Sequence, residues 1–295
     1  MIRVATLTTN TKGRDFVIGD LHGHYDQLTA LLEKNHFDAT IDRVISTGDL
    51  CDRGPRSWDC LQLHLEPWFY GVLGNHESHL LGLASLATLA LRRGVATSTI
   101  VDAVKDIGKG MDSEWFAEWV SIEVNHSKLS ALIELLQSIP HVIAVRGEGC
   151  TYNVVHAELL KAGIDSDHAL DSLQGNQKDD KPLLWSGSLI TESREQQVEA
   201  TSENRYDPNS KLSITFCGHN VVPKPVAYKN HLFIDTGCGF EPDQYPELED
   251  CLGLTAVILP DFEIAFEKAK AQKQRKSKKS VDISNINGKT EKGGQ

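Results

Sequence analysis

Five apolar, β-branched or aromatic runs along the chain each stop at a polar residue. The runs are FVIGD (16–20), RVISTGD (43–49), WFYGVLGN (68–75), CTYNVVH (150–156) and ITFCGH (214–219). A short apolar run bounded by turn residues is typical of a buried strand. We therefore expect five strands, and each of them ends in a side chain that is able to bind a metal ion.

Segments with helical apolar spacing separate the first runs. They cover residues 25–34, 57–65 and 77–91, which gives a β-α-β-α-β-α order. That order predicts parallel, buried strands joined by right-handed crossovers, and so an α/β fold. Because ligands of open α/β sheets bind at the carboxyl ends of the strands, the terminal polar residues should converge in one crevice.

A helical insertion is expected after the third helix. Residues 98–138 predict two or three amphipathic helices, with the segments WFAEWVSI and KLSALIELLQSI, and Pro140 ends the stretch. We interpret about residues 96–139 as an insertion that covers the crevice.

The second half of the chain predicts loops and a second sheet. Polar, turn-rich sequence at residues 165–181 and 192–210 indicates surface loops. Strand patterns return at residues 211–218, 231–237 and 254–260 without helices between them. They predict an antiparallel second sheet packed on the first.

Composition fits a globular protein, because 40% of the 295 residues are apolar and 24% are charged. The first residues, MIRVATLTTN, lack a signal-peptide core, and no run approaches the roughly 20 apolar residues that span a bilayer. Six cysteines occur without a CxxC pair, which favours reduced thiols over a disulfide framework. We expect a cytoplasmic protein with no membrane partner.

Charge divides the chain into an acidic body and a basic tail. The net charge of −11 argues against nonspecific binding of nucleic acid, and we predict no specific nucleic-acid partner. Residues 267–295 carry nine Lys/Arg and three Asp/Glu with few apolar residues, so we expect a disordered tail. Its expected role is solubilising, with contact to an anionic partner as the alternative. Residues 1–266 then form the catalytic domain.

Short motifs at the strand ends supply a set of metal ligands. GDLHG, GDLCDRG, GNHE, VVHAE and CGHN place Asp20, His22, Asp49, Asn75, His156 and His219 there. Oxygen and imidazole donors without thiolate suit Mn²⁺, Fe, Zn²⁺ or Co²⁺. Asp49 is placed to bridge two ions about 3.5–4 Å apart, which would share and acidify one water molecule. We predict two divalent ions, a bridging hydroxide and in-line attack on a phosphoryl group.

Three further residues beside these motifs have catalytic chemistry. His76 and Asp52 are the expected acid pair, in which a protonated imidazole oriented by a carboxylate protonates the leaving oxygen. Arg53 is the expected phosphate clamp, because a guanidinium binds phosphate bidentately. Glu77 and Asp235 are candidate hydrogen-bond acceptors for metal-bound histidines, with a helix cap or turn as an equal alternative.

The same motifs, in this order, resemble those of the phosphoprotein phosphatases within the calcineurin-like metallophosphoesterases. The likeness covers most of residues 15–239 and is greatest to the bacteriophage-lambda type of serine/threonine phosphatase. The resemblance implies an α/β/β/α sandwich, manganese as the usual ion and hydrolysis of phosphomonoesters, with a phosphoprotein or a small phosphate ester as substrate.

The resemblance also implies how the ligands are divided between two ions. The first ion would be held by Asp20, His22 and Asp49. The second would be held by Asp49, Asn75, His156 and His219. His76 with Asp52 would be the acid pair, and Arg53 the phosphate clamp.

The chain departs from this family pattern near Trp185. Members carry a second phosphate-binding arginine shortly after the corresponding tryptophan, whereas this chain has Ser-Gly-Ser at residues 186–188. Arg194 or Arg205, from the following loop, is the candidate substitute. If neither reaches the site, we expect weaker phosphate binding or a substrate that differs from a standard phosphoprotein. The helical stretch before Pro140 also differs from that of the phage enzyme.

Three other functions compete with a serine/threonine phosphatase. Symmetrical diadenosine tetraphosphate hydrolases share the metal motifs but usually have alanine where this chain has Asp52. Activity on phosphotyrosine or small phosphate esters is a second alternative. A non-catalytic phosphate-binding module is the third, and it predicts loss of ligands, although none is lost here.

Overall fold

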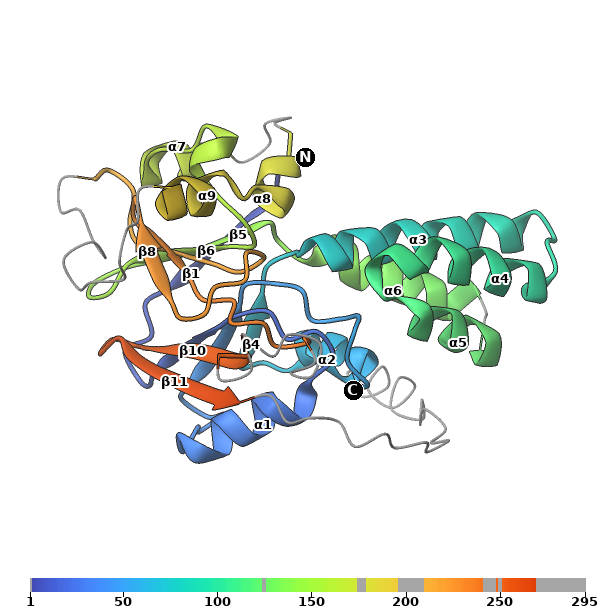
Figure 1. Cartoon of the computed structure of the whole chain (residues 1–295), viewed down its shortest axis with the longest axis horizontal. Coiled ribbons are helices and arrows are strands. Elements are labelled where there is room, and N and C mark those ends of the chain that lie inside the picture. The colour runs from blue at the N-terminus through green and yellow to red at the C-terminus, as the bar shows by residue number, and fades with distance from the viewer. Residues whose placement is uncertain are drawn as a thin grey trace, which may run out of the picture.

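Two β-sheets packed face to face form the body of the protein in a computed structural model (Figure 1). The structure describes residues 2–123, 126–173, 179–195, 210–240, 248 and 251–268. The first sheet has the order β11 (Glu263–Lys268), β10 (Gly253–Leu259), β2 (Asp15–Ile18), β3 (Arg43–Ser46) and β4 (Phe69–Gly71). The second has the order β1 (Val4–Thr8), β5 (Val142–Arg146), β6 (Tyr152–Val155), β7 (Thr215–Cys217), β9 (His231–Phe233) and β8 (Val226–Tyr228).

Helices cover the outer faces of both sheets. Figure 1 shows α1 (Tyr25–Lys34) and α2 (Ser57–Gln62) beside the first sheet. The second sheet is covered by α7 (Asp167–Asp171), α8 (Lys181–Trp185) and α9 (Ser188–Glu195). The remaining helices are α3 (Asn75–Arg92), α4 (Thr97–Gly108), α5 (Glu114–Glu123) and α6 (His126–Ser138). The α/β/β/α sandwich is thereby confirmed.

Alternation of side chains along the strands produces the layers. In β2, Phe16 and Ile18 pack against the helices, while Val17 packs between the sheets. In β6, Val154 points between the sheets and Val155 points to the outer helices. Successive side chains of a strand point to opposite faces, so strands that are apolar at every position fill two cores at once. This is why the runs in the sequence are continuous.

The predicted parallel arrangement is correct for the first three strands, because β2 pairs with β3 and β3 with β4 in parallel. The predicted antiparallel second sheet is wrong in two respects. β7 pairs in parallel with both β6 and β9, and β10 joins the first sheet antiparallel to β2. β1, β5, β8 and β11 were not predicted. Strand patterns define buried faces but do not encode which partner each strand pairs with.

The helical insertion consists of three helices, α4, α5 and α6, which pack together with α3 and extend from one end of the sandwich (Figure 1). It reaches the Asp52 turn through Trp115 at the start of α5 and through the Asp112 carbonyl just before this helix. Its expected role as a cover of the crevice stays a prediction. The predicted surface loop at 165–181 contains α7, whose first turn is capped by Ser166. Part of the other predicted loop belongs to α9.

Other expectations about the chain concern its ends and its thiols. β11 continues through Lys268 and so includes the first two residues of the expected tail (267–295), because Lys268 pairs with Gly253. The rest of the tail lies outside the described residues. All six cysteines are unpaired thiols. In the part of the chain that the structure describes, no helix has the length and apolarity needed to cross a bilayer.

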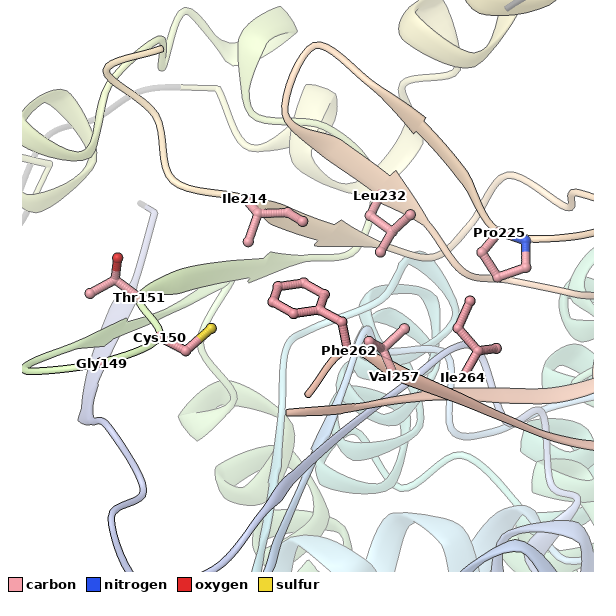
Figure 2. A pocket seen from close by; sticks show the side chains of 9 residues that line it. All are labelled: Gly149, Cys150, Thr151, Ile214, Pro225, Leu232, Val257, Phe262 and Ile264. Atoms are coloured by element: carbon pink, nitrogen blue, oxygen red, sulfur yellow. The ribbon is translucent and has the colours of Figure 1, made fainter. Parts of the chain in front are cut away.

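A pocket of about 420 Å³ lies between the two sheets. Figure 2 shows Ile214 and Leu232 facing Val257 and Phe262 across it. Thr151 and Ile214 line it just before β6 and β7 begin, whereas the predicted ligands follow the ends of these strands. The pocket is therefore at the opposite end of the sandwich from the predicted site, and none of its lining residues is a predicted ligand.

A buried ion pair joins the sheets near this opposite end. Arg43 on β3 donates two hydrogen bonds of 2.7 Å to the carboxylate of Asp15 on β2. Tyr152 on β6 donates its hydroxyl to the same carboxylate at 2.6 Å, and Arg43 also binds the Thr8 carbonyl. The network therefore connects both sheets through one buried charge.

Replacing Arg43 with alanine should lower the free energy of unfolding by about 3–5 kcal/mol, because Asp15 would be left buried and unpaired. Urea denaturation measures this change. The matched control is Lys109→Ala, which breaks an exposed pair with Asp106 and should change the free energy of unfolding far less, because solvent screens exposed pairs. Equal effects of the two substitutions would contradict the role assigned to the Asp15 network.

Candidate metal centre

The predicted ligands converge where five strands end. Asp20 follows β2, Asp49 follows β3, and Asn75 follows β4, while His156 and His219 follow β6 and β7. Among the residues that the structure describes, two side-chain groups are close enough to hold an ion, and both contain Asp49: one with His22 and His76, the other with His156 and His219. Asp49 Oδ2 lies 3.6 Å from His22 Nε2, and Asp49 Oδ1 lies 3.5 Å from His156 Nε2. The two oxygens of Asp49 therefore face different groups.

Backbone carbonyls set the orientation of the histidine rings. His22 Nδ1 lies 3.0 Å from the Cys51 carbonyl oxygen, and His156 Nδ1 lies 2.9 Å from that of Thr47. A carbonyl only accepts, so each Nδ1 carries the proton and donates it. Burial lowers the pKa of both imidazoles, which favours the neutral ring with a lone pair on Nε2. Neutral imidazole in this orientation is the usual metal ligand.

The contact between His156 and Asn75 is one that a bound cation would explain. His156 Nε2 carries a lone pair, yet it lies 2.7 Å from the Asn75 side-chain oxygen, which is another acceptor. His219 Nδ1 lies 3.1 Å from the same oxygen. Burial lowers the pKa of His219 to about 4, so this ring is also neutral at pH 7. Converging electron pairs of this kind fit a divalent ion bound between them.

The excess of negative charge in the site also fits a bound cation. Asp20 accepts hydrogen bonds from Thr47 Oγ1 at 3.0 Å and from the His219 amide at 2.9 Å. Burial, together with the carboxylates of Asp235 and Asp49, raises the pKa of Asp20 well above its ordinary value. Buried carboxylates at close quarters are costly unless a cation compensates them. Thr47 was not predicted as part of the site, although it lies in the RVISTGD motif.

The predicted acid pair is formed as a direct hydrogen bond. His76 Nδ1 donates to Asp52 Oδ2 at 2.7 Å, and Asp52 is fully buried. Burial opposes charge on His76, but the carboxylates of Asp49 and Asp52 outweigh it and raise the pKa of the imidazole. Trp115 donates its indole N–H to the other oxygen of Asp52 at 2.6 Å. Nothing in the sequence distinguished Trp115 from the other tryptophans.

Arg53 lies at the edge of the site. Its guanidinium donates to His22 Nε2 at 2.8 Å and lies 4.7 Å from the centre of the Phe240 ring. Residues 186–188, directly after Trp185, include no arginine. The hydroxyls of Ser186 and Ser188 both donate to buried Glu158.

Of the two arginines considered as substitutes, Arg194 donates to the Val221 carbonyl, two residues from His219. Arg205 lies outside the described residues.

Glu77 and Asp235 do not contact the histidine rings, so the cap and turn alternatives are correct. Glu77 accepts four backbone N–H groups: Asp49, Leu50 and Cys51 after β3, and Gly74 at the start of α3. The bond to Gly74 is the reciprocal half of a helix capping box. Asp235 accepts from the amide of Gly237 in a turn. The backbone carbonyls of Cys51 and Thr47, rather than these carboxylates, accept the hydrogen bonds from the histidine rings.

Several site residues have a strained backbone. His22, Asp49, Asp52, Arg53 and His219 all have φ between 43° and 72°, in the left-handed region that non-glycine residues rarely adopt. Such strain persists only where surrounding contacts enforce it, and it is concentrated at functional sites. Glycines supply the space, because a Cβ on Gly74 would collide with Asp49 and one on Gly218 with Asp20.

Comparisons with known proteins agree with this geometry. The sequence profile of the calcineurin-like phosphoesterases matches residues 16–223. Serine/threonine-protein phosphatase 2 of Escherichia coli (strain K12) is 28% identical over 225 residues, 75% of this chain and 86% of the relative. The symmetrical bis(5'-nucleosyl)-tetraphosphatase of Yersinia pseudotuberculosis is 26% identical over 261 residues, 85% of this chain and 77% of the relative. A crystal structure described as a candidate diadenosine tetraphosphatase superposes with a TM-score of 0.57 at 19% identity, covering 92% of this chain and all of that one.

Replacing Glu77 with glutamine should destabilise the protein by about 2–4 kcal/mol, because the amide NH₂ would face backbone donors and leave them unsatisfied. Urea denaturation of the metal-free protein measures the change. Glu134→Gln on the exposed face of α6 is the matched control and should be nearly neutral. A neutral Glu77→Gln variant would show that this carboxylate does not hold the two turns together.

Replacing Asp49 with asparagine should remove a shared charged ligand and so reduce the amount of Mn²⁺ bound at both positions. Isothermal titration calorimetry with Mn²⁺ measures the stoichiometry and affinity. The control is Asp52→Asn, which changes a buried carboxylate in the same turn outside the predicted ligand set and should leave the stoichiometry unchanged. Unaltered Mn²⁺ binding by the Asp49 variant would refute the shared-ligand arrangement.

Proposed function

Because this chain belongs to the calcineurin-like phosphoesterase family, we propose that it is a metal-dependent phosphatase acting on phosphoserine and phosphothreonine monoesters. The buried hydrogen bond between Asp52 and His76 carries the proposal. Hydrolysis of an alkyl phosphate has a poor leaving group, which needs a proton as the ester bond breaks. A phosphatase for serine and threonine esters therefore depends on an oriented acid at this position.

In this proposal the ligand set is divided as the family resemblance implies. Asp20, His22 and Asp49 would hold one divalent ion, and Asp49 with Asn75, His156 and His219 would hold the second. The bound ions would supply Lewis acidity and an acidified water as nucleophile. We propose Mn²⁺ for both positions, as the family resemblance implies, and the oxygen and imidazole donors without thiolate are compatible with it.

The other residues of the site bind phosphate and move protons. The guanidinium of Arg53 and a metal ion need the same lone pair of His22 Nε2, so we expect Arg53 to leave this contact and bind a phosphate oxygen when the site is loaded. His76 directs Nδ1 at Asp52, which leaves Nε2 to deliver a proton to the leaving oxygen. Asp52 keeps that ring oriented and stabilises its positive charge.

A second candidate function is hydrolysis of diadenosine tetraphosphate. Two observations favour it: the relative of that name in Yersinia pseudotuberculosis is 26% identical, close to the value for the phosphatase of Escherichia coli, and residues 186–188 are Ser-Gly-Ser, without the arginine of the phosphatase pattern. Trp185 is 51% exposed and its ring lies 6.0 Å from that of His219, where a base could stack on it. Against it stands Asp52, where such hydrolases usually have alanine.

The full-length protein, stripped of metal and supplied with Mn²⁺, should release phosphate from a phosphoserine peptide and from p-nitrophenyl phosphate. His76→Asn should lower kcat on the phosphoserine peptide about 10²–10⁴-fold, the usual contribution of a positioned acid. Phosphate release at saturating substrate measures both effects. Mn²⁺ titration of the variant is the control that separates loss of the acid from loss of the ions.

The substrate panel decides between the candidates. A higher kcat/KM for diadenosine tetraphosphate than for the phosphoserine peptide would assign the nucleotide substrate. A higher value for a phosphotyrosine peptide would assign a tyrosine or broad phosphatase. Absence of turnover with Mn²⁺, Zn²⁺, Co²⁺ and Fe²⁺ on every substrate would overturn the enzyme proposal.

A further inference from the structure

We propose that Trp115, on the helical insertion, is a positioning residue that fixes the carboxylate of Asp52 and, through it, the acid His76. The inference rests on the proposed phosphatase activity. It assigns the insertion a role in catalysis, because Trp115 lies in the first turn of α5, more than 60 positions along the chain from Asp52. No substrate contact is assigned to Trp115.

The carboxylate of Asp52 is held at both oxygens. Oδ2 accepts from His76 Nδ1 at 2.7 Å, and Oδ1 accepts from the Trp115 indole at 2.6 Å. One donor on each oxygen prevents the carboxylate from rotating about its Cβ–Cγ bond. Hydrogen bonds to an ionised acceptor are short and strong, and burial of Asp52 strengthens them further. The direction of the His76 ring is therefore set partly by α5.

The insertion also contacts the backbone beside Asp52. The Arg53 amide donates to the Asp112 carbonyl at 3.3 Å, just before α5 begins. Asp52 and Arg53 both have left-handed φ values, of 72° and 63°, which need outside contacts to persist. Ser57 Oγ accepts from the Asp52 amide at 2.9 Å from the other side. The strained turn is thus held between α2 and the turn that precedes α5.

Aromatic packing holds α5 in a fixed position. Phe116 and Trp119 are buried, and their rings stack with centroids 5.6 Å apart. The Trp119 ring also lies 5.4 Å from that of Trp58 on α2. These contacts anchor α5 to the helix that follows the Asp52 turn, so the Trp115 indole is presented from a fixed element.

Two other tryptophans nearby show that packing alone does not explain the hydrogen bond from Trp115 to Asp52. The buried indole nitrogens of Trp58 and Trp119 have no hydrogen-bond partner in the described part of the chain. This core therefore accommodates an indole without a partner for its N–H. The Trp115 indole differs because it is directed at a carboxylate that orients the proposed acid.

The test is Trp115→Phe in the full-length, Mn²⁺-loaded protein, which keeps an aromatic ring and removes the N–H. Phenyl phosphate and p-nitrophenyl phosphate are compared, because the phenolate of the first is the poorer leaving group and needs the proton more. We expect kcat on phenyl phosphate to fall roughly tenfold, as for outer hydrogen-bond partners of metal ligands. KM and kcat on p-nitrophenyl phosphate should change less than about threefold. The number of Mn²⁺ ions bound should stay the same.

Trp119→Phe is the matched control, because it alters the same helix and removes an indole N–H that has no partner. It should change both substrates equally. A second measurement does not require activity: with ¹⁵N-labelled tryptophan, Asp52→Asn should shift the indole N–H resonance of Trp115 and leave that of Trp119 in place.

The inference is overturned if Trp115→Phe retains wild-type kcat on both substrates, lowers both equally, or if Asp52→Asn shifts no indole resonance. Failure of the wild-type enzyme on both esters would instead overturn the proposed function, and the positioning role with it. A selective loss on phenyl phosphate with normal Mn²⁺ binding supports the assignment.

Discussion

The carboxylate of Glu77 joins the two turns on which the site is built. It is completely buried and accepts backbone N–H groups from the turn after β3 and from the first residue of the turn into α3. Such turns expose several donors that water cannot reach, and the carboxyl group of Glu77 satisfies four of them. The position of Asp49 relative to His76 depends on this junction, and the His76 amide also donates to Asp49 Oδ1.

Parallel pairing determines which side chains can meet at that junction. β2, β3 and β4 run in the same direction, so their carboxyl ends bring Asp20, Asp49 and Asn75 to one edge. β6 and β7 are also parallel, and the second sheet delivers His156 and His219 from across the sandwich. The left-handed turns at these ends are stabilised by the hydrogen bonds around them. The site is therefore shared between both sheets.

The outer parts of the site are held by different contacts from its centre. The ligands are held by carbonyls and buried carboxylates, whereas the region beyond Trp185 presents two hydroxyls bound to Glu158 and no guanidinium. One buried corner of the insertion contacts the Asp52 turn, although the helices themselves extend away from the sandwich. Different elements thus build the centre and the outer part of the site, and family membership shows the phosphoesterase class but not the substrate.

The sequence by itself determined the α/β class, the first parallel strands and the identity of the nine candidate site residues. Continuous apolar runs that end in glycine and a polar residue report burial and sharp turns, which are local properties. It did not determine the pairing of β10 with β2, the mixed second sheet or the four unpredicted strands, because pairing depends on distant segments.

Only the tertiary structure decided the contacts between elements. It showed that Glu77 binds backbone rather than histidine, and that Trp115 reaches Asp52 across more than 60 residues of chain. Spacing along the chain carries no information about such contacts, since packing of α5 against α2 places them. The local sequence pattern therefore predicted the candidate residues of the site. The packing of helices and sheets decided what holds each of them in place.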